Sequence, residues 1–379
     1  MKKLLALSLA LVMVFALVAC GNGQTTGTPS TPTSPSSPSG SGTSATTPPA
    51  DDDPFADMKE ITLIYSSTKN EKADAAQLAY LENITNATGG KVKWDVYLSN
   101  SLITSTRDIP EGVSGGIADV ATLNINNYTS IFPLNYNVLS TPFTGVTDAC
   151  RLDIMTYMYD KYPELDQEFT NAGLKRIGWS LTNSNNMGVK LGKAYSSIAD
   201  VKNIKITGSS EVVIDILAAA GAVPVTVAFP EIYQSLEKNV INGFVNHSAP
   251  AFAMSFHEHI DNWIVFGEGS GICVDLVAVV MGLDKWNSLP AAVQEAFLAA
   301  EPERAIAEAG TQRNFDKMLK KTVQEAGKHY VVLDEQQLAE WMPFVQPVVN
   351  QILKDMEASH PGFGAMYDDL CDYVANYDK

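Results

Sequence analysis

The sequence predicts an α/β protein with room for two domains. The chain has 379 residues, of which 45% are apolar, so a sizeable core is available. Apolar strand-like runs alternate with helical segments from residue 60 onward, and again between residues 200 and 247. Because parallel strands need helical crossovers, this order favours mixed, mostly parallel sheets flanked by helices.

The first twenty residues are typical of a signal peptide. Lys2 and Lys3 precede an apolar run that is too short to span a bilayer comfortably. The run ends in Leu17-Val18-Ala19-Cys20, which resembles the cleavage site of bacterial lipoproteins. That resemblance implies that Cys20 is lipidated and becomes the mature N-terminus. An ordinary secretory signal with an incidental cysteine is the alternative.

Residues 21–56 are rich in Thr, Pro, Ser and Gly, so we expect a tether without a core. The formal net charge of the chain is −17, and loss of Lys2 and Lys3 would make it −19. Such a charge disfavours binding to nucleic acid and broad adsorption to anionic lipid.

The first part of the body predicts the order β-α-β-α-β. The strands are expected at residues 60–65, 91–98 and 118–123, with helices at 71–88 and 106–115 between them. A loop is expected at residues 133–143, followed by helices around Pro163. Two separate strands, 174–179 and 187–191, are then predicted on either side of an Asn-rich turn.

The second part begins with a strand around Ile204 and Ile206 and a helix that Ser209 or Ser210 can cap. A short strand, a helix starting at Pro230 and a further strand follow. Later predictions are a helix at 249–257, strands at 264–266 and 272–280, and helices at 290–327 and 335–356. We expect Pro302 to kink or split the long helix, and the tail aromatics to pack on the second domain (Trp341, Phe344, Phe363, Tyr367).

Several motifs occur together in one order along the second part of the chain. Asp200 to Gly208 reads D-V-K-N-I-K-I-T-G, and Gly221 to Pro224 reads G-A-V-P. An E-x-Y-x-x-L pattern at Glu231 leads to Gly243 and Asn246, and K-W-N-S-L-P begins at Lys285. From about residue 60 to its end, the chain resembles the extracytoplasmic solute-binding proteins of TRAP transporters, of the dicarboxylate- and sialic-acid-binding type.

This resemblance implies a two-lobed fold of the periplasmic-binding-protein kind, type II-like, with hinge strands and a long helix joining the lobes. Lobe I would comprise residues 57–183 and 272–313, and lobe II residues 184–271 and 314–379. It implies an extracytoplasmic protein that closes on a small organic solute, with a carboxylic acid as the expected class, and delivers it to the membrane subunits of a TRAP permease. No catalysis and no cofactor are expected.

The sequence departs from that family at the ligand clamp. Thr207 stands where the family has an arginine, and a second family arginine is missing near Asn185 or Asn186. A threonine offers one neutral hydroxyl where a guanidinium makes two charge-assisted bonds to a carboxylate. Lys69 or Lys190 could supply the positive charge, and a neutral or polyol-like ligand stays an alternative.

The expected ligand-binding residues come from both lobes. The resemblance and the placement of polar residues after strands predict polar contacts from Ser67, Asp108 and Asn124 in lobe I and from Asn186, Thr207, Ser210 and Asn246 in lobe II. Phe229 and Trp179 would supply apolar walls, although each could instead fill a core.

Two other classes of protein are compatible with parts of the sequence. A binding protein of an ABC importer or a sensor system would close in the same way. A surface hydrolase would need a nucleophile, and Gly112-Val113-Ser114-Gly115-Gly116 matches G-x-S-x-G, but it follows a predicted helix and precedes a strand, the reverse of the hydrolase order. The remaining cysteines, Cys150, Cys273 and Cys371, do not suggest a disulfide framework.

Overall fold

The computed structural model describes residues 53–377. The predicted signal peptide, Cys20 and residues 21–52 of the predicted tether lie outside the described residues. None of the helices within residues 53–377 combines the length and the apolar character needed to cross a bilayer.

Lobe I is built on a mixed sheet in the order β2-β1-β3-β9-β4. β1, β2 and β3 are parallel, and β9 runs antiparallel to both β3 and β4. Its strands are β1 (Ile61–Ser66), β2 (Val92–Tyr97), β3 (Val120–Asn124), β4 (Leu174–Val189) and β9 (Cys273–Gly282). Its helices are α1 (Ala75–Ala87), η1 (Thr106–Asp108), α2 (Ile109–Ser114), η2 (Ile125–Asn127), α3 (Pro133–Leu139), α4 (Arg151–Lys161), α5 (Glu164–Asn171) and α9 (Leu283–Ser288).

Lobe II is built on the second half of β4, which pairs with β7 and β8. β5 lies parallel to β6 and β7, and β10 lies parallel to β8. Its other strands are β5 (Lys205–Thr207), β6 (Val223–Pro224), β7 (Gly243–Asn246), β8 (Asn262–Val265) and β10 (His329–Val332). Its helices are η3 (Ile198–Val201), α6 (Glu211–Ala219), η4 (Phe229–Glu231), α7 (Ile232–Glu237), α8 (Ser248–Ala253), η5 (Phe256–His259), α11 (Glu335–Ala339) and α12 (Met342–Ser359).

Each lobe has an apolar core on both faces of its sheet. In β9, Val279 belongs to one core of lobe I with α1 and α10 (Ala291–Glu325), whereas Val280 belongs to the other with α3 to α5. In lobe II, Val245 and Phe244 are divided in the same way between two cores. The alternation of buried side chains along each strand therefore fills both faces, as the predicted α/β class requires.

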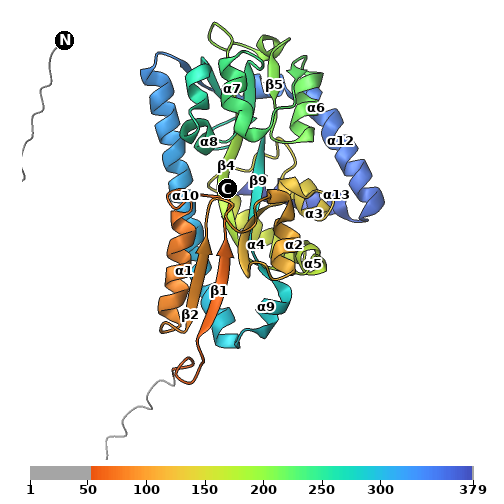
Figure 1. The fold of residues 1–379 in the computed structure, drawn as a ribbon. Helices are drawn as coiled ribbons and strands as arrows, with labels where there is room; N and C mark the ends of the chain where they lie inside the picture. Colours follow the sequence, from red (N-terminus) through yellow and green to blue (C-terminus); the bar gives the residue numbers. More distant parts are fainter. Residues whose placement is uncertain (1–52, 378–379) are drawn as a thin grey trace, which may run out of the picture. The chain divides into compact units, whose positions relative to one another are not determined.

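Two strands and one helix belong to both lobes (Figure 1). β4 pairs with β9 in lobe I and with β7 and β8 in lobe II, and α10 packs against lobe I near Phe297 and against lobe II near Leu319. The predicted return of the chain through residues 272–280 and the predicted long helix are confirmed. The prediction of two separate strands around residues 183–186 was wrong, because β4 continues through them.

The structure corrects two further predictions in full and one in part. Residues 133–139 form α3 rather than a loop. Of the two effects expected of Pro302, a split does not occur, because α10 continues through this residue as one helix. The tail does not pack on lobe II alone: Trp341 lies in a lobe II core, but Phe363, at the start of α13 (Phe363–Asn376), lies in a lobe I core. The helices predicted at 249–257 and 335–356 are each divided, into α8 and η5 and into α11 and α12, and the helix predicted at 106–115 begins as η1. The other predicted strands and helices are present, with ends shifted by a few residues.

Candidate functional site

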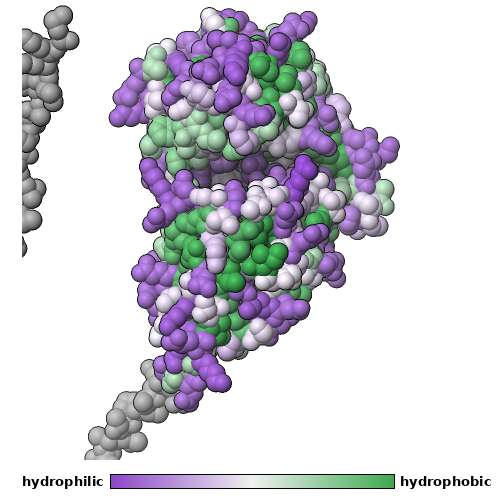
Figure 2. Space-filling view, viewed as in Figure 1, coloured by the Kyte–Doolittle hydropathy of each residue, from purple (hydrophilic) through white to green (hydrophobic). Residues whose placement is uncertain are grey.

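The carboxyl ends of the parallel strands in the two lobes point toward each other. β3 runs in the same direction as β4, from lobe I toward lobe II, and β7 runs against β4, back toward lobe I. Asn124, at the end of β3, is level with Ser180 of β4, whereas Asn246, at the end of β7, is level with Asn186. Ser180 and Asn186 are six residues apart on β4, so the two sheet edges are separated by roughly 20 Å along this strand. Figure 2 shows the surface hollowed between the lobes.

On the lobe I edge, Ser67 and Asn124 follow two adjacent parallel strands. The Ser67 hydroxyl is buried and accepts a bond from the backbone N–H of Lys69 at 3.1 Å. The Asn124 side chain accepts from the N–H of Asn126 at 3.0 Å and so caps η2. Asp108 is exposed at the end of η1, and its charge acts on the buried Tyr128 phenol, whose pKa is raised chiefly by burial.

On the lobe II edge, Thr207 and Asn246 end two neighbouring parallel strands, and Asn186 lies opposite Asn246. Asn186 is occupied by its own lobe: it donates to the carbonyls of Ser184 and Ser270 and accepts from the N–H of Phe266 at 3.0 Å. This favours a structural role for Asn186. Ser210 caps α6 by accepting from the N–H of Val213 at 3.4 Å.

The two predicted apolar walls differ in exposure. Trp179 is 5% exposed and its ring packs against Tyr159 and Phe169, so its position favours core packing over ligand contact. Phe229 is 46% exposed at the start of η4, with one ring edge against Phe256. Phe229 is therefore the one of the two that keeps a free apolar surface.

The floor between the two edges carries an acidic residue that the sequence reasoning missed. Along one face of β9, Cys273 belongs to the lobe II core and Val279 to the lobe I core, and the half-buried positions between them are Asp275 and Val277. Asp275 Oδ1 accepts from Asn185 Nδ2 at 2.8 Å and from Asn126 Nδ2 at 3.4 Å. The sequence did carry one sign of this residue, because Asp275 is the single charged side chain in the apolar run 272–280.

His247 lies on the lobe II side of this region. It stands at the N-cap of α8, directly after Asn246, and its Nδ1 is buried without a hydrogen-bond partner. Burial lowers the pKa of His247 to about 4; Asp275 opposes this shift, whereas the charges of Lys69 and Arg151 reinforce it. The imidazole is therefore neutral at pH 7 and offers hydrogen-bonding capacity rather than charge.

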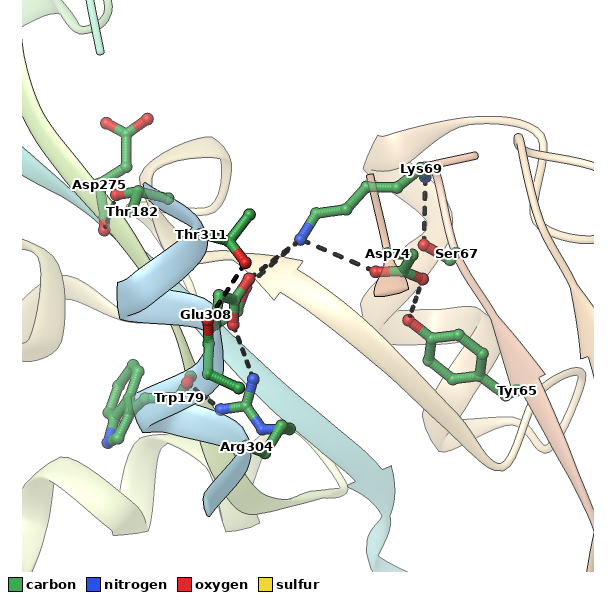
Figure 3. Close-up of polar contacts among 12 residues, drawn as sticks. Tyr65, Ser67, Lys69, Asp74, Trp179, Thr182, Asp275, Arg304, Glu308 and Thr311 are labelled. Atoms are coloured by element: carbon green, nitrogen blue, oxygen red, sulfur yellow. Dashed lines mark hydrogen bonds and ion pairs between the residues drawn. The ribbon is translucent and has the colours of Figure 1, made fainter. Parts of the chain in front are cut away.

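Lys69 extends from the lobe I edge toward α10 (Figure 3). Its ammonium lies 3.3 Å from Glu308 and 3.8 Å from Asp74, and 31% of its side chain is exposed. Burial alone would raise the pKa of Glu308, but Lys69 and Arg304 outweigh it and hold that pKa below its usual value. Lys69 is therefore a charged, partly exposed group beside the cleft. Both of its ionic contacts, to Glu308 and to Asp74, are longer than 3.2 Å.

Lys190, the other lysine considered, is remote from this wall. It follows the last residue of β4 and bonds Asn239 at 2.9 Å, at the edge of lobe II where β7 begins rather than ends.

Arg151 and Arg304 do not replace the arginine clamp that the family resemblance implies. Arg151 is 4% exposed at the start of α4, where it donates to the carbonyl of Thr182 and to Ser184 Oγ at 2.7 Å and pairs with Asp148 at 2.8 Å. Arg304 is 3% exposed among Glu301, Glu308 and the Trp179 carbonyl. Both guanidinium groups brace β4 instead of facing a solute.

A second space lies beside the hinge. A cavity of about 150 Å³ is bordered by Asn183, Ser184, Asn186, Asp316, Lys320, Tyr330 and neighbouring residues. Burial raises the pKa of Asp316 to about 6, against the opposing effect of bonds from Ser248 and Asn183. Of the predicted ligand-binding residues, only Asn186 borders this cavity.

The features that could have supported other chemistry occupy structural positions. Ser114 ends α2, is exposed, and donates to the Glu111 carbonyl at 3.4 Å; β3 follows it, so the helix-then-strand order predicted for this motif is confirmed. Within residues 53–377, no group of three or more His, Cys, Asp or Glu side chains is arranged to hold a metal ion. The thiols of Cys150, Cys273 and Cys371 are free.

Comparison with known proteins agrees with this architecture. The family model for bacterial extracellular solute-binding proteins, family 7, matches residues 64–355. The chain is 24% identical over 307 residues to the C4-dicarboxylate-binding periplasmic protein DctP of Vibrio cholerae serotype O1, covering 81% of this chain and 89% of that protein. It is 24% identical over 304 residues to a solute-binding protein of Chromohalobacter salexigens, covering 78% of this chain and 83% of that protein.

Solved structures show the same fold. A marine metagenome TRAP solute-binding protein in complex with 3-hydroxybenzoate superposes with a TM-score of 0.74 at 18% identity, covering 85% of this chain and 100% of that one. A TRAP solute-binding protein of Chromohalobacter salexigens with bound D-glucuronate gives 0.69 at 17% identity, covering 82% and 99%. The chain therefore belongs to family 7 of the bacterial extracellular solute-binding proteins, the solute-binding proteins of TRAP transporters.

Proposed function

We propose that this protein captures a small organic acid between its two lobes and delivers it to the membrane subunits of a TRAP transporter. The observation that carries the proposal is the pair of opposed sheet edges, with Ser67 and Asn124 on one side and Thr207 and Asn246 on the other. Open α/β sheets bind ligands at the carboxyl ends of their strands. A solute that touches both edges favours the closed arrangement by its higher affinity for it.

The organic-acid class is supported by the relatives. The similar proteins include a C4-dicarboxylate-binding protein and complexes with 3-hydroxybenzoate and D-glucuronate. In this chain Lys69 is the group that could attract the carboxylate, since 31% of its side chain is exposed and its two acidic contacts exceed 3.2 Å. Lobe I would comprise residues 57–183 and 272–313, and lobe II the rest of the body.

A thermal-shift screen of the mature protein tests solute capture, because a ligand that binds only the folded state raises the melting temperature. Hydroxy, oxo, amino, aromatic and sugar acids are compared with neutral sugars and polyols, and calorimetry follows each hit. Lys69→Met should weaken acid binding by about tenfold, whereas Lys190→Met should leave it unchanged. If neutral polyols bind and no acid does, the acid class is rejected.

Delivery and anchoring need their own tests. Uptake of the identified acid into vesicles that contain the TRAP membrane subunits should require this protein; uptake that needs ABC subunits instead would reject the TRAP assignment. We infer from the lipobox that Cys20 carries the anchor and that residues 21–56 hold the body away from the membrane. Cys20→Ser should release the protein from cells, and retention on the membrane would contradict the anchor.

A further inference from the structure

We propose that the solute carries a protonated amine in addition to its carboxylate, and that Asp275 accepts the N–H donors of that amine. The inference rests on the proposed function, since it concerns the solute bound in the same cleft. It starts from the position of Asp275 on the floor between the lobes, where β9 passes from one core to the other.

Asp275 has a free oxygen. A carboxylate has about four lone-pair positions, and both amide donors, Asn126 and Asn185, go to Oδ1. Oδ2 has no hydrogen bond, and no Lys, Arg or His lies within ion-pairing distance of Asp275 anywhere in residues 53–377. The oxygen is not fully buried, so a solute on the floor between the lobes could reach it.

Within the described residues no cation pairs with Asp275. Lys69 lies beside Asp74 and Glu308, with contacts long enough for it to attract a solute carboxylate, and Arg151 pairs with Asp148 at 2.8 Å. His247 does not compensate Asp275 at pH 7, because burial keeps its imidazole neutral. The negative charge of Asp275 is therefore not balanced by a neighbouring cation. It would repel a solute whose only charged groups are carboxylates.

One further carboxylate strengthens the negative field from lobe II. The buried Tyr136 phenol, whose pKa is raised mainly by burial, is affected by the charges of both Glu211 and Asp275, so the two carboxylates lie near the same group. Glu211 forms no ion pair within the described part of the chain.

Unpaired polar atoms mark the same place. Asn185 is fully buried, and the amide that donates to Asp275 leaves its own Oδ1 without a partner. His247 Nδ1 is also buried and unpaired. Both atoms can accept a hydrogen bond and neither carries positive charge, which suits a solute rich in N–H donors.

Matched acids that differ in one substituent provide the test. We would titrate the mature protein at pH 7 with glutamate, 2-hydroxyglutarate and 2-oxoglutarate, with alanine, lactate and pyruvate, and with phenylalanine, phenyllactate and phenylpyruvate. Amine-free acids, including D-glucuronate and 3-hydroxybenzoate, complete the panel. The amino member of at least one trio should bind about tenfold or more tightly than both of its analogues, as expected for a charge-assisted bond.

Asp275→Asn keeps the shape and removes the charge. It should weaken binding of the amino acid by about tenfold and leave the oxo acid unchanged or tighter. A purely structural role would weaken all members equally. Asp215→Asn, an exposed change on α6, is the matched control and should alter nothing.

The outcomes separate this inference from the proposed function. If amine-free acids bind and no amino acid competes with them, or if Asp275→Asn weakens every acid alike, the amine assignment is wrong while acid capture stands. If no acid of any kind binds, acid capture fails and the inference fails with it. The wild-type comparison decides the matter even if the variant does not fold.

Discussion

Replacing Arg304 by Ala should destabilise the protein strongly, because its guanidinium is enclosed by groups that depend on it. Its Nη1 lies 2.7 Å from Glu308, its Nε 2.6 Å from Glu301, and its Nη2 donates to the Trp179 carbonyl. Only 1% of the side chain is exposed. Removal leaves Glu301 without its counter-charge, Glu308 with Lys69 alone, and one buried carbonyl without its guanidinium donor.

Breaking a buried ion pair by removing one partner costs about 3–5 kcal/mol. At roughly 2 °C per kcal/mol for a protein of this size, the melting temperature should fall by roughly 6–10 °C. Calorimetric melting at pH 7 measures this shift. Arg313→Ala changes an exposed arginine of the same helix and should move the midpoint by less than about 2 °C.

A double-mutant cycle with Glu308→Gln sharpens the test. Because Arg304 and Glu308 are in direct contact, the two losses should not add, and the coupling should reach at least about 1 kcal/mol. Additive losses, or a single-variant shift no larger than that of Arg313→Ala, would refute the account of this network.

Three further outcomes are expected. If Thr207 occupies the clamp position that the family resemblance implies, Thr207→Arg should raise the affinity for simple carboxylic acids by about tenfold, measured by calorimetry, because a guanidinium can make two charge-assisted bonds to a carboxylate. Gly271→Ala should lower the free energy of unfolding by about 1–3 kcal/mol in urea, since its methyl group would overlap the hinge backbone, whereas Gly310→Ala, with an open helical position, should stabilise slightly. His247 should make the free energy of unfolding fall by about 3 kcal/mol between pH 6.5 and about 4, and His247→Gln should abolish this fall while His329→Gln should not.

The sign of the last effect follows from the lowered pKa. Between pH 6.5 and about 4, His247 binds a proton in the unfolded chain but stays neutral in the folded protein. Lower pH therefore favours the unfolded state. An identical pH profile for wild type and His247→Gln would contradict the burial argument. No gain for any acid with Thr207→Arg would show that position 207 is not the clamp, and equal stabilities of the two glycine variants would contradict the close approach at the hinge.

The alternation of strands and helices was readable in the sequence, because most elements carry an apolar face of the right period. The exceptions depend on distant partners. Residues 133–139 form a helix because the Glu168 carboxylate, from α5, accepts from the N–H groups of Leu134 and Asn135 at 2.7 and 3.1 Å. The residues around the start of a helix cannot predict a capping carboxylate that comes from a residue more than thirty positions later in the sequence.

The Asn-rich segment 183–186 has turn-forming residues, yet pairing on both sides holds it extended as part of β4. Pro302 is tolerated because it lies on an exposed part of α10, where water can reach the carbonyl left without an N–H partner. In both cases the tertiary environment outweighs a local preference.

The candidate site was predictable where residues follow parallel strands. Ser67, Asn124, Thr207 and Asn246 could be placed at sheet edges from their order alone, whereas Asp275 could not, because its role depends on where β9 passes between two cores. Sequence spacing does not reveal which stretch of a buried strand is left uncovered.

The unbroken course of β4 and β9 has a mechanical consequence. Any rotation of one lobe against the other must bend two hydrogen-bonded strands, and the register shift between Leu181 and Ser184 is where the ladder yields most easily. Under the proposed capture, a solute that drew the lobes together would bend these two strands, and their return to the unbent course would favour reopening once the solute leaves.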